Sequence, residues 1–286
     1  MNDMILILNY SDEFAVEAAK RLRGEQVFCK IISGMTTAAQ IAEIAPRGLV
    51  LCGEPKSAAG VFDAEILKLD IPVLALGHAA HMLIAAMGGA CAGTAISEKK
   101  ANIQYTDCKL FSGVEGGERY IQEAVTLMLP ADVQVTAGAG GCTIAFEDSR
   151  RALFGVQFEL ERNDPDGSTI LKNFARDICG CMPWFTMDAA LAEARRMLAD
   201  ASMEGGFAVC GVSGGVDSTV AAVLAHQAFG ERMTAIYVET GLMRAGEGAA
   251  VRAIYEQLGI PLRVIDRAED VLASLRGRQT MGEKLA

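Results

Sequence analysis

Short apolar runs of strand length alternate with amphipathic segments along the first 75 residues. The runs MILILNY, VFCKII, GLVLCG and IPVLAL are interleaved with helix-like segments at 12–23 and 37–44. Such alternation is typical of βαβ units, because parallel strands need a crossover connection that is usually a helix. A second series, with FAVCGV, MTAIYV and PLRVID, follows an amphipathic helix at 188–199. We therefore expect an α/β protein with mostly parallel sheets in two domains.

The stretch CGCMPWFT marks the expected junction between the two series. We place the first domain at 1–180, a linker at 181–187 and the second domain at 188–286, which agrees with about two domains for 286 residues. Between 93 and 158 the apolar runs are shorter, and the turn chemistry of 147–151 predicts the loop of a hairpin. Antiparallel strands are expected there, and a helix at 168–178 is expected to close the first domain.

The composition narrows the classes of partner. The formal net charge is −10, so a general nucleic-acid surface is not expected, because phosphate neutralisation needs clustered Lys and Arg. No apolar run approaches the ~20 residues of a membrane helix, and we expect no membrane partner and a cytoplasmic location. The eight cysteines are scattered, which favours free buried thiols over a zinc site.

The stretch PVLALGHAAHMLIAAMGG predicts a strand, a tight elbow and a helix. In α/β enzymes such an elbow often presents a nucleophile where a helix N-terminus can stabilise an oxyanion. Here the elbow carries no Ser, Thr or Cys. His78 and His81 are either site residues or simple residues of the helix start, and Cys52 and Cys91 are either substitute thiols or packing residues.

The segment VCGVSGGVDSTVAAVLAH predicts a phosphate-binding loop between a strand and a helix. Gly214 and Gly215 let the backbone approach a ligand, and the N–H groups of the helix start form an anion site. Ser213 and Ser218 would add hydroxyl donors, while Asp217 would cap the helix or hold Mg²⁺. The alternative is an ordinary Gly-rich turn with capping side chains. The loop lacks the G-x-x-x-x-G-K-[ST] spacing of the common nucleotide loop.

Three motifs together resemble the GMP synthetase family of the glutamine-hydrolysing kind. They are SGGVDSTVAA, the junction ILKNFARDICGC with WFTMDAAL, and VETGLMRAGEG. The resemblance implies a class I glutamine amidotransferase domain followed by an adenine nucleotide α-hydrolase-like (ATP pyrophosphatase) domain. It also implies a ligase that uses ATP and Mg²⁺ to aminate xanthosine monophosphate through an adenylated intermediate. The ammonia would come from solution or from a partner glutaminase.

The resemblance also implies site residues in the second domain. The ATP and pyrophosphate site would be Ser213, Gly214, Gly215, Val216, Asp217, Ser218 and Thr219, with Asp217 as the candidate Mg²⁺ ligand. Val238, Glu239 and Arg244 would contact nucleotide or substrate, with Glu239 in place of the family's aspartate. Arg244 is alternatively a solvated loop charge.

The first domain departs from the family's catalytic motifs. Aligning the family form G-x-C-x-G-x-Q with GHAAHML places the nucleophilic cysteine on Ala79. The family's G-V-Q-F-H-P-E reads GVQFELE, which puts Glu159 in the place of the catalytic histidine and leaves Glu161 in the third position. Glu54 also falls in the oxyanion-side loop, where a carboxylate would oppose a developing negative charge. A methyl group cannot attack a carboxamide, so we expect the glutaminase activity to be lost.

The resemblance implies a longer pyrophosphatase domain and a dimerisation domain, which the 286 residues do not contain. We therefore expect a fragment, a truncated product or one component of a split system, and a homo-oligomer if the further region exists. The alternative function is a non-catalytic ATP-binding or regulatory pseudo-amidotransferase.

Overall fold

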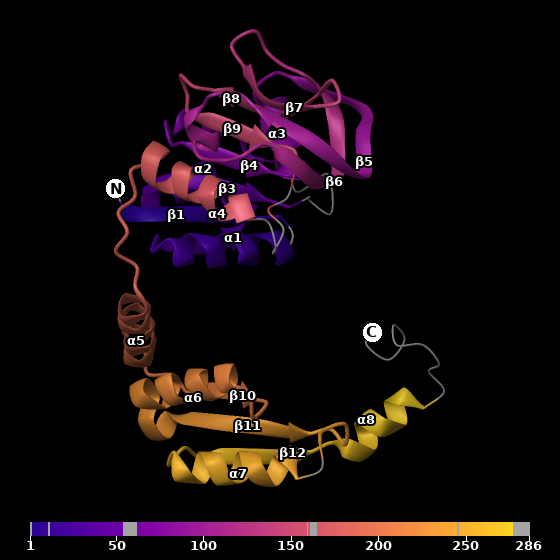
Figure 1. The fold of residues 1–286 in the computed structure, drawn as a ribbon. Coiled ribbons are helices and arrows are strands. Elements are labelled where there is room, and N and C mark those ends of the chain that lie inside the picture. The colour runs from indigo at the N-terminus through magenta and orange to yellow at the C-terminus, as the bar shows by residue number, and fades with distance from the viewer. Residues whose placement is uncertain are drawn as a thin grey trace. The chain divides into compact units, whose positions relative to one another are not determined.

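The chain folds into two compact units, residues 1–186 and 187–286. The computed structural model describes residues 2–10, 12–53, 62–158, 160, 165–244 and 246–276. Figure 1 shows the element order along the chain, and each unit is described by itself. The linker expected at 181–187 spans the division, which falls between Thr186 and Met187.

A nine-stranded sheet forms the centre of the first unit, in the order β2-β1-β3-β4-β9-β8-β7-β5-β6. The strands are β1 (Asn2–Asn9), β2 (Cys29–Ser33), β3 (Pro46–Cys52), β4 (Val73–Leu76), β5 (Ala90–Tyr105), β6 (Gly117–Met128), β7 (Gln134–Ala139), β8 (Cys142–Asp148) and β9 (Leu153–Val156). The five strands from β2 to β9 run parallel, and β9 to β6 are joined antiparallel. The expected mixture of parallel and antiparallel strands is therefore present.

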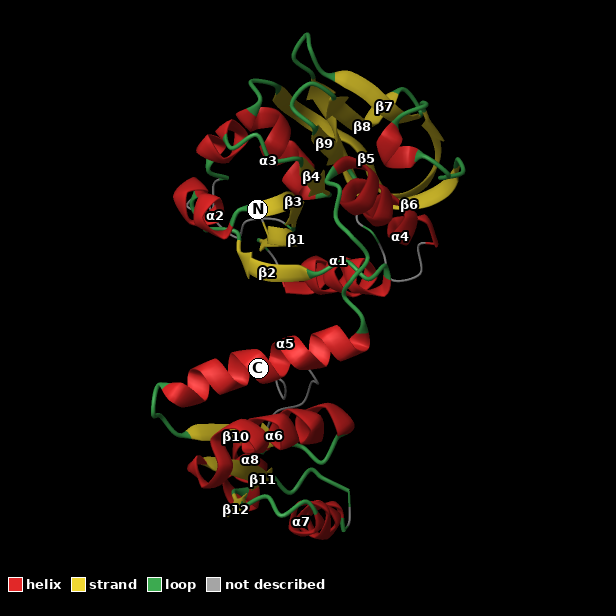
Figure 2. Cartoon of the chain, turned by 90° about the vertical axis from the view of Figure 1, so that its left-hand side faces the viewer, coloured by secondary structure: helices red, strands yellow, loops and turns green. Residues whose placement is uncertain are grey.

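Helices cover both faces of the parallel part (Figure 2). They are α1 (Asp12–Gly24) and α4 (Pro165–Lys172) on one face, and α2 (Ala38–Ile44) and α3 (His78–Ala86) on the other. In β1, Ile5 and Ile7 pack in the core with α1 and α4, whereas Leu6 and Leu8 pack in the core with α2 and α3. Burial on both faces explains why the strands read as continuous apolar runs.

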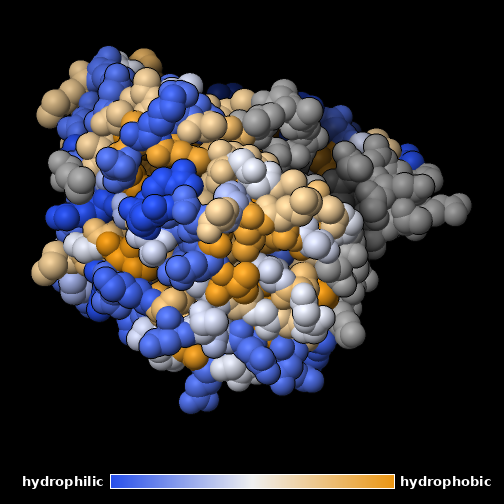
Figure 3. Space-filling view, turned by 90° about the horizontal axis from the view of Figure 1, so that it is seen from above, coloured by the Kyte–Doolittle hydropathy of each residue, from blue (hydrophilic) through white to orange (hydrophobic). Residues whose placement is uncertain are grey.

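The antiparallel part of the sheet contains the hairpin expected near 147–151. β8 and β9 pair with Asp148 opposite Leu153, so the turn is 149–152 and begins two residues later than expected. β5 and β6 form a long ribbon whose register shifts at two places. Seen from above in Figure 3, apolar side chains reach the surface of this unit in patches between polar ones.

Short helical segments and a fixed tail complete the first unit. The segments are η1 (Ala64–Lys68), η2 (Lys109–Phe111) and η3 (Asn173–Ile178), the last a π-helix that continues α4. After it, Phe185 donates its backbone N–H to Gln26 O at 2.8 Å, and its ring contacts the tilted ring of Phe28, with centroids 4.9 Å apart. All eight cysteines are free, and four of them are buried, Cys179 and Cys181 included.

The second unit holds a parallel three-stranded sheet in the order β10-β11-β12. Its elements are α5 (Met187–Met203), β10 (Ala208–Val212), α6 (Val216–Phe229), η4 (Gly230–Arg232), β11 (Met233–Glu239), α7 (Glu247–Gln257), β12 (Leu262–Asp266) and α8 (Ala268–Leu275). The core contains Tyr237 and Tyr255, both fully buried. In α6 only Ala222 is buried, and two of its valines are exposed, Val216 at 78% and Val220 at 51%. Within the described residues, no helix is long and apolar enough to cross a membrane.

Candidate functional site

The elbow of the first unit is a sharp turn at a single glycine. β4 ends at Leu76 and α3 begins at His78, and Gly77 between them has φ 59° and ψ −128°. Its N–H donates to Val156 O at 2.8 Å, which fixes the turn against β9. A positive φ is a conformation that residues with a Cβ adopt at a cost, and it is the geometry expected where a strand turns directly into a helix. The elbow residue is therefore Gly77.

Ala79 lies in the helix that follows the elbow. Ala79 is the second residue of α3, is fully buried, and packs in the core beneath the helix. A side chain there faces the interior of the unit and could not reach a substrate. The turn itself is at Gly77, two residues before Ala79, and the assignment of Ala79 to the nucleophile's position stays a prediction. Gly77 itself provides no side chain at all.

Polar side chains next to the elbow are tied into a closed network. His81 Nε2 lies 2.7 Å from Gln157 Oε1, which also accepts the Val125 N–H at 2.8 Å. The amide nitrogen of Gln157 donates to Val125 O at 3.0 Å and to Thr143 O at 2.6 Å. Gln157 is 1% exposed, so these bonds replace water completely. The network joins α3 to β6 and β8.

The second histidine of the elbow faces a carboxylate. His78 Nε2 lies 3.5 Å from Glu123 Oε2 on β6, and the His78 and His81 rings meet edge to face with centroids 5.4 Å apart. His78 and His81, the two histidines considered as possible site residues, therefore both lie at the elbow, and each contacts a polar side chain. The expected positions Glu54, Glu159 and Glu161 lie outside the described residues.

Neither candidate substitute thiol is placed as a nucleophile. Cys52 is fully buried at the end of β3. Cys91 is exposed, but its Sγ lies 3.9 Å from the main-chain oxygen of His81, and burial of the sulfur raises the pKa of the thiol. A raised pKa reduces the thiolate that would act as nucleophile. Cys52 is therefore a packing residue, whereas Cys91 is exposed on β5 with a thiol that is not activated.

In the second unit, the loop 213–215 connects β10 to α6 as the sequence predicted. Gly214 has φ 78°, and Gly215 is the N-cap of α6 without a side-chain cap. The first N–H groups of the helix, from Val216 onward, have no carbonyl partner within the helix. They lie at the carboxyl end of a parallel strand, which is where α/β folds bind ligands.

Hydroxyl groups converge on this loop. Ser213 Oγ lies 3.3 Å from Ser218 Oγ, and Ser218 Oγ also accepts the Ser213 N–H at 3.2 Å. Thr219 donates its hydroxyl to Gly215 O at 2.9 Å. The side chain of Asp217 is exposed in the first turn of α6. The predicted loop residues are thus brought together as one cradle with three hydroxyls, one carboxylate and free backbone donors.

Helix α7 connects this loop to Glu239. A Cβ on Gly214 would lie 2.6 Å from Val251 Cγ2, so α7 packs directly on the loop backbone. One turn earlier in α7, a Cβ on Gly248 would lie 2.5 Å from Glu239 Oε2. The Glu239 carboxylate therefore rests on the start of α7, where its charge favours the helix N-terminus.

A buried tyrosine lies beneath Glu239. Tyr237 is fully buried, and burial, followed by the charges of Glu239 and Glu247, raises the pKa of its phenol. Its hydroxyl has no hydrogen-bond partner among the described residues. The side chain therefore stays neutral and supports the end of β11 from below.

The remaining predicted contacts lie around the same edge. Val238 is partly exposed on β11, and Arg244 is exposed in the following loop, where its backbone N–H donates to Glu247 Oε2 at 3.1 Å. Among the described residues, no three His, Cys, Asp or Glu side chains gather as a metal site. A metal ion at this edge would take most of its ligands from the phosphates of a nucleotide.

The fold and the two loops define a class of protein: an amidotransferase-like unit followed by an ATP pyrophosphatase-like unit. The first unit has the fold of a GMP synthase subunit from Thermoplasma acidophilum, with TM-score 0.54 and 19% identity over 62% of this chain and 93% of that one. A glutamine amidotransferase from Thermotoga maritima gives TM-score 0.52 and 11% identity over 63% of this chain and 99% of that one. Residues 192–286 match the NAD synthase family. The predicted fold class is confirmed.

Sequence relatives make the resemblance specific. The chain is 32% identical to a GMP synthase [glutamine-hydrolyzing] from Clostridium perfringens over 97% of its own length and 56% of that protein. It is 34% identical to one from Rhodopseudomonas palustris over 97% of its length and 54% of that protein. The chain is thus homologous to glutamine-hydrolysing GMP synthases, and it spans about half the length of these curated relatives.

Sequence reasoning missed three features of these sites. Gly77 lies in the predicted elbow, but its role depends on a φ angle that no sequence pattern displays. Gln157 belongs to the GVQFELE motif, yet its four hydrogen bonds reach residues that are distant in sequence. The Glu239 carboxylate packs against Gly248, and the only sequence pattern that points to this contact is V-E-T-G-L-M-R followed by a Gly-rich helix start.

Proposed function

We propose that this chain is a GMP synthase-like protein of purine nucleotide biosynthesis whose second unit binds ATP with Mg²⁺ and whose first unit has lost glutaminase activity. The observation that carries the proposal is the Ser213–Thr219 cradle, which combines a Gly with positive φ, three hydroxyls and a helix N-terminus. The homology to GMP synthases supports the same assignment.

The residues of the cradle fit a triphosphate. Gly214 has a positive φ, which lets the loop turn its backbone N–H groups toward phosphate oxygens, and Val251 packs where a Cβ would lie. The α6 N–H groups and the hydroxyls of Ser213 and Ser218 supply donors. Asp217 supplies one exposed carboxylate for Mg²⁺, which is bound in such sites by one or two carboxylates plus phosphate oxygens.

The proposed reaction is the one that the resemblance implies. An oxygen of the purine carbonyl attacks the α-phosphorus of ATP, the bond from that phosphorus to the bridging oxygen breaks, and pyrophosphate leaves. Ammonia then adds to the activated carbon, and AMP leaves with the oxygen. The cradle would hold the β- and γ-phosphates before the bond breaks and the pyrophosphate afterwards. Val238, Glu239 and Arg244 would contact the rest of the nucleotide or the substrate, xanthosine monophosphate.

The ammonia would have to come from solution or from a partner glutaminase. Gly77 offers no atom that could attack the carboxamide of glutamine, and the sequence has Glu159 where the family has its histidine. A covalent thioester route needs both a thiol and a base. We expect no glutamine hydrolysis by the wild-type chain, and none by the variants Cys52→Ser and Cys91→Ser. Hydrolysis that Cys91→Ser abolishes would show that the thiol is used.

Exchange of labelled pyrophosphate into ATP tests the nucleotide chemistry. With xanthosine monophosphate and Mg²⁺, an active adenylating chain returns label to ATP, because pyrophosphate release is reversible. Asp217→Asn should lower this exchange if Asp217 holds Mg²⁺, whereas Asp270→Asn, on exposed α8 and paired with Arg267, should not. ATP binding without any exchange would contradict the catalytic proposal for this chain.

That same outcome would support a second candidate, a non-catalytic ATP-binding or regulatory pseudo-amidotransferase. The absence of a nucleophilic side chain at Gly77 favours it. A homo-oligomer is expected if the protein also has the dimerisation region that the family resemblance implies. Absence of ATP binding would contradict both candidates.

A further inference from the structure

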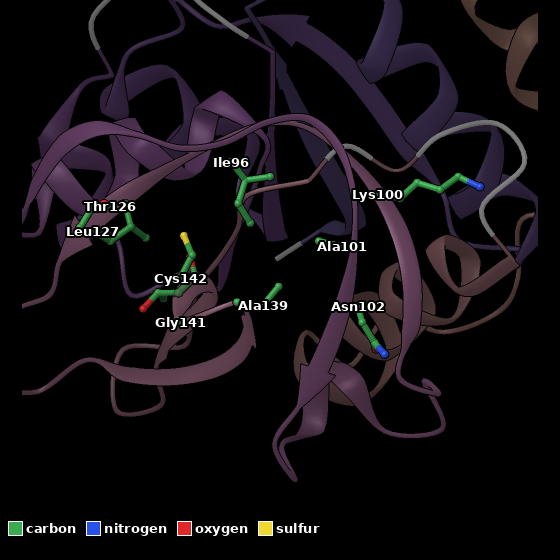
Figure 4. A pocket seen from close by; sticks show the side chains of 11 residues that line it. Ile96, Lys100, Ala101, Asn102, Thr126, Leu127, Ala139, Gly141 and Cys142 are labelled. Atoms are coloured by element: carbon green, nitrogen blue, oxygen red, sulfur yellow. The ribbon is translucent and has the colours of Figure 1, made fainter.

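A pocket in the first unit and the phosphate loop in the second unit differ in how well they define a ligand. The pocket has a volume of about 570 Å³ and lies against β5, β6 and the tip of the β7–β8 hairpin (Figure 4). Its labelled lining includes Lys100, whose ammonium points away from the space. The phosphate loop, in contrast, lies beside an acidic side chain whose chemistry can select a ligand, that of Glu239.

Glu239 is the last residue of β11, the strand that pairs with β10 directly before the phosphate loop at 213–215. The last aligned pair of these two strands is Val212 with Tyr237, so the chain continues into the loop on one side and toward Glu239 on the other. The strands are parallel and end at the same edge of the sheet. Glu239 therefore lies at the carboxyl edge next to the loop, where α/β folds bind ligands.

Helix α7 holds the Glu239 carboxylate close to the backbone of the loop. A Cβ on Gly248 would lie 2.5 Å from Glu239 Oε2, and a Cβ on Gly214 would lie 2.6 Å from Val251 Cγ2. Gly248 and Val251 are three residues apart, which is about 4.5 Å along the axis of an α-helix. Less than one turn of α7 thus separates the residue that packs on the carboxylate from the residue that packs on the loop.

The Glu239 carboxylate accepts no hydrogen bond from the residues that the structure describes, and the side chain is partly exposed. Two neighbouring carboxylates do accept one. Glu247 Oε2 accepts the Arg244 N–H at 3.1 Å, and Asp266 Oδ1 accepts the Ala268 N–H at 3.0 Å. An ionised carboxylate can accept about four hydrogen bonds. Glu239 therefore has acceptor positions available for a ligand at this edge.

We propose that Glu239 accepts a hydrogen bond from the ribose 2′-hydroxyl of the nucleotide whose phosphates lie on the loop, and so makes the site selective for ribonucleotides. The inference rests on the proposed function, because it takes ATP as the ligand. In dinucleotide-binding α/β folds an acidic residue about 20 residues after the glycine-rich loop binds this hydroxyl. Glu239 lies 24 residues after Gly215, at the end of the next strand.

The charge of this corner also suits a neutral sugar hydroxyl. Burial, followed by the charges of Glu239 and Glu247, raises the pKa of Tyr237 beneath them, so both carboxylates act on the same place. A hydroxyl that donates to an ionised carboxylate forms a short, charge-assisted hydrogen bond. A ribose that carried a phosphate on this hydroxyl would instead be repelled. Glu239 would thus discriminate against both the missing and the phosphorylated hydroxyl.

Calorimetry on the full chain with Mg²⁺ compares the binding of ATP and 2′-deoxyATP. Loss of one hydrogen bond to a charged group weakens binding by roughly ten-fold or more, so wild type should prefer ATP by about ten-fold. Glu239→Ala should reduce this preference to less than about two-fold, mainly by weakening ATP. Glu239→Gln keeps the packing against Gly248 and removes the charge, so its preference should fall to about three-fold.

Glu247→Ala is the matched control, because it removes the neighbouring carboxylate at the start of α7. This variant should keep the ten-fold preference, whatever its effect on the affinity for both nucleotides. The ratio separates the two roles of Glu239, since a looser α7 would weaken ATP and 2′-deoxyATP equally.

Two results would overturn the inference while leaving the proposed ATP site in place. One is wild type that binds ATP and 2′-deoxyATP alike. The other is a preference for ATP that both Glu239→Ala and Glu239→Gln retain in full. Wild type that binds neither nucleotide would contradict the proposed function itself, and the inference with it.

Discussion

His81 Nε2 and Gln157 Oε1 lie 2.7 Å apart, and the remaining bonds of Gln157 fix which atom donates. The Gln157 amide nitrogen faces two carbonyl oxygens, those of Val125 and Thr143, so its oxygen must face His81. The histidine therefore carries its proton on Nε2. One side chain thus joins the elbow helix to two strands of the antiparallel part through direct hydrogen bonds.

Gln157→Leu should destabilise the first unit by about 2–4 kcal/mol, because it leaves buried backbone groups of Val125 and Thr143 unpaired. Chemical denaturation with CD detection measures the change. Gln134→Leu, at an exposed position on β7, is the control and should stay within about 0.5 kcal/mol of wild type. A loss for Gln157→Leu no larger than for the control would show that the network contributes little.

Gly77→Ala should destabilise the first unit by about 1–3 kcal/mol, because Gly77 holds φ 59° and a Cβ is strained there. Gly24→Ala, at the end of α1 with open space around it, should be neutral or slightly stabilising. Thermal unfolding of the two variants compares them directly. If Gly77→Ala is as stable as wild type, Gly77 is not the strained elbow.

The two elbow residues show how far the sequence could predict the site. The strand ending near Leu76 and the helix after it follow from local periodicity, and both are where the pattern placed them. The identity of the elbow residue depends on a backbone angle fixed by a bond between Gly77 and Val156, which are 79 positions apart. Periodicity carries no information on such a bond, so no local signal shows which residue forms the turn.

The second unit was more predictable, because its site is local. Ser213, Ser218 and Thr219 lie within seven residues, and strand, loop and helix follow each other directly. Two contacts of α7 could not be predicted, that of Val251 with Gly214 and that of Gly248 with the Glu239 carboxylate. Loops separate α7 from Gly214 and from Glu239 along the chain, so no local pattern indicates these contacts. Antiparallel strands were expected in the region of β5 and β6, but the length of this ribbon was not, because its residues alternate too irregularly for a strand pattern.

Asp148 should make the stability of the first unit depend on acid pH. Burial alone would raise its pKa, but the hydrogen bonds from Arg151 and from the backbone of residues 150 and 151 outweigh burial and lower it. Because its pKa is lower in the folded state, the ionised Asp148 carboxylate stabilises the fold at pH values above its unfolded-state pKa of about 3.9. This stabilisation is lost as the pH falls through the folded-state pKa. Asp148→Asn should therefore be less stable than wild type at pH 6, with a gap that narrows below pH 4. Urea unfolding at both pH values measures the gap, and a constant gap would contradict this role.

Gly214→Ala should destabilise the second unit by about 2–4 kcal/mol, because it combines a positive φ with a Cβ that meets Val251. Gly205→Ala has a similar φ of 83° in open space, so it reports the backbone strain alone and should cost about 1 kcal/mol. The difference between the two variants measures the packing of α7 on the loop. Equal losses would mean that Val251 moves aside freely.

Binding of ATP with Mg²⁺, measured by calorimetry on the full chain, tests the central claim most directly. Ser218→Ala removes a cradle hydroxyl, whereas Ser274→Ala removes one that makes the same type of bond, to the carbonyl three residues earlier, on α8. Loss of a hydrogen bond to a charged phosphate is worth about 1.5–3 kcal/mol, or roughly 10- to 100-fold in affinity. We predict that wild type and Ser274→Ala bind ATP alike and that Ser218→Ala binds at least ten-fold more weakly. Wild-type binding that Ser218→Ala leaves unchanged, or no binding at all, would contradict the account.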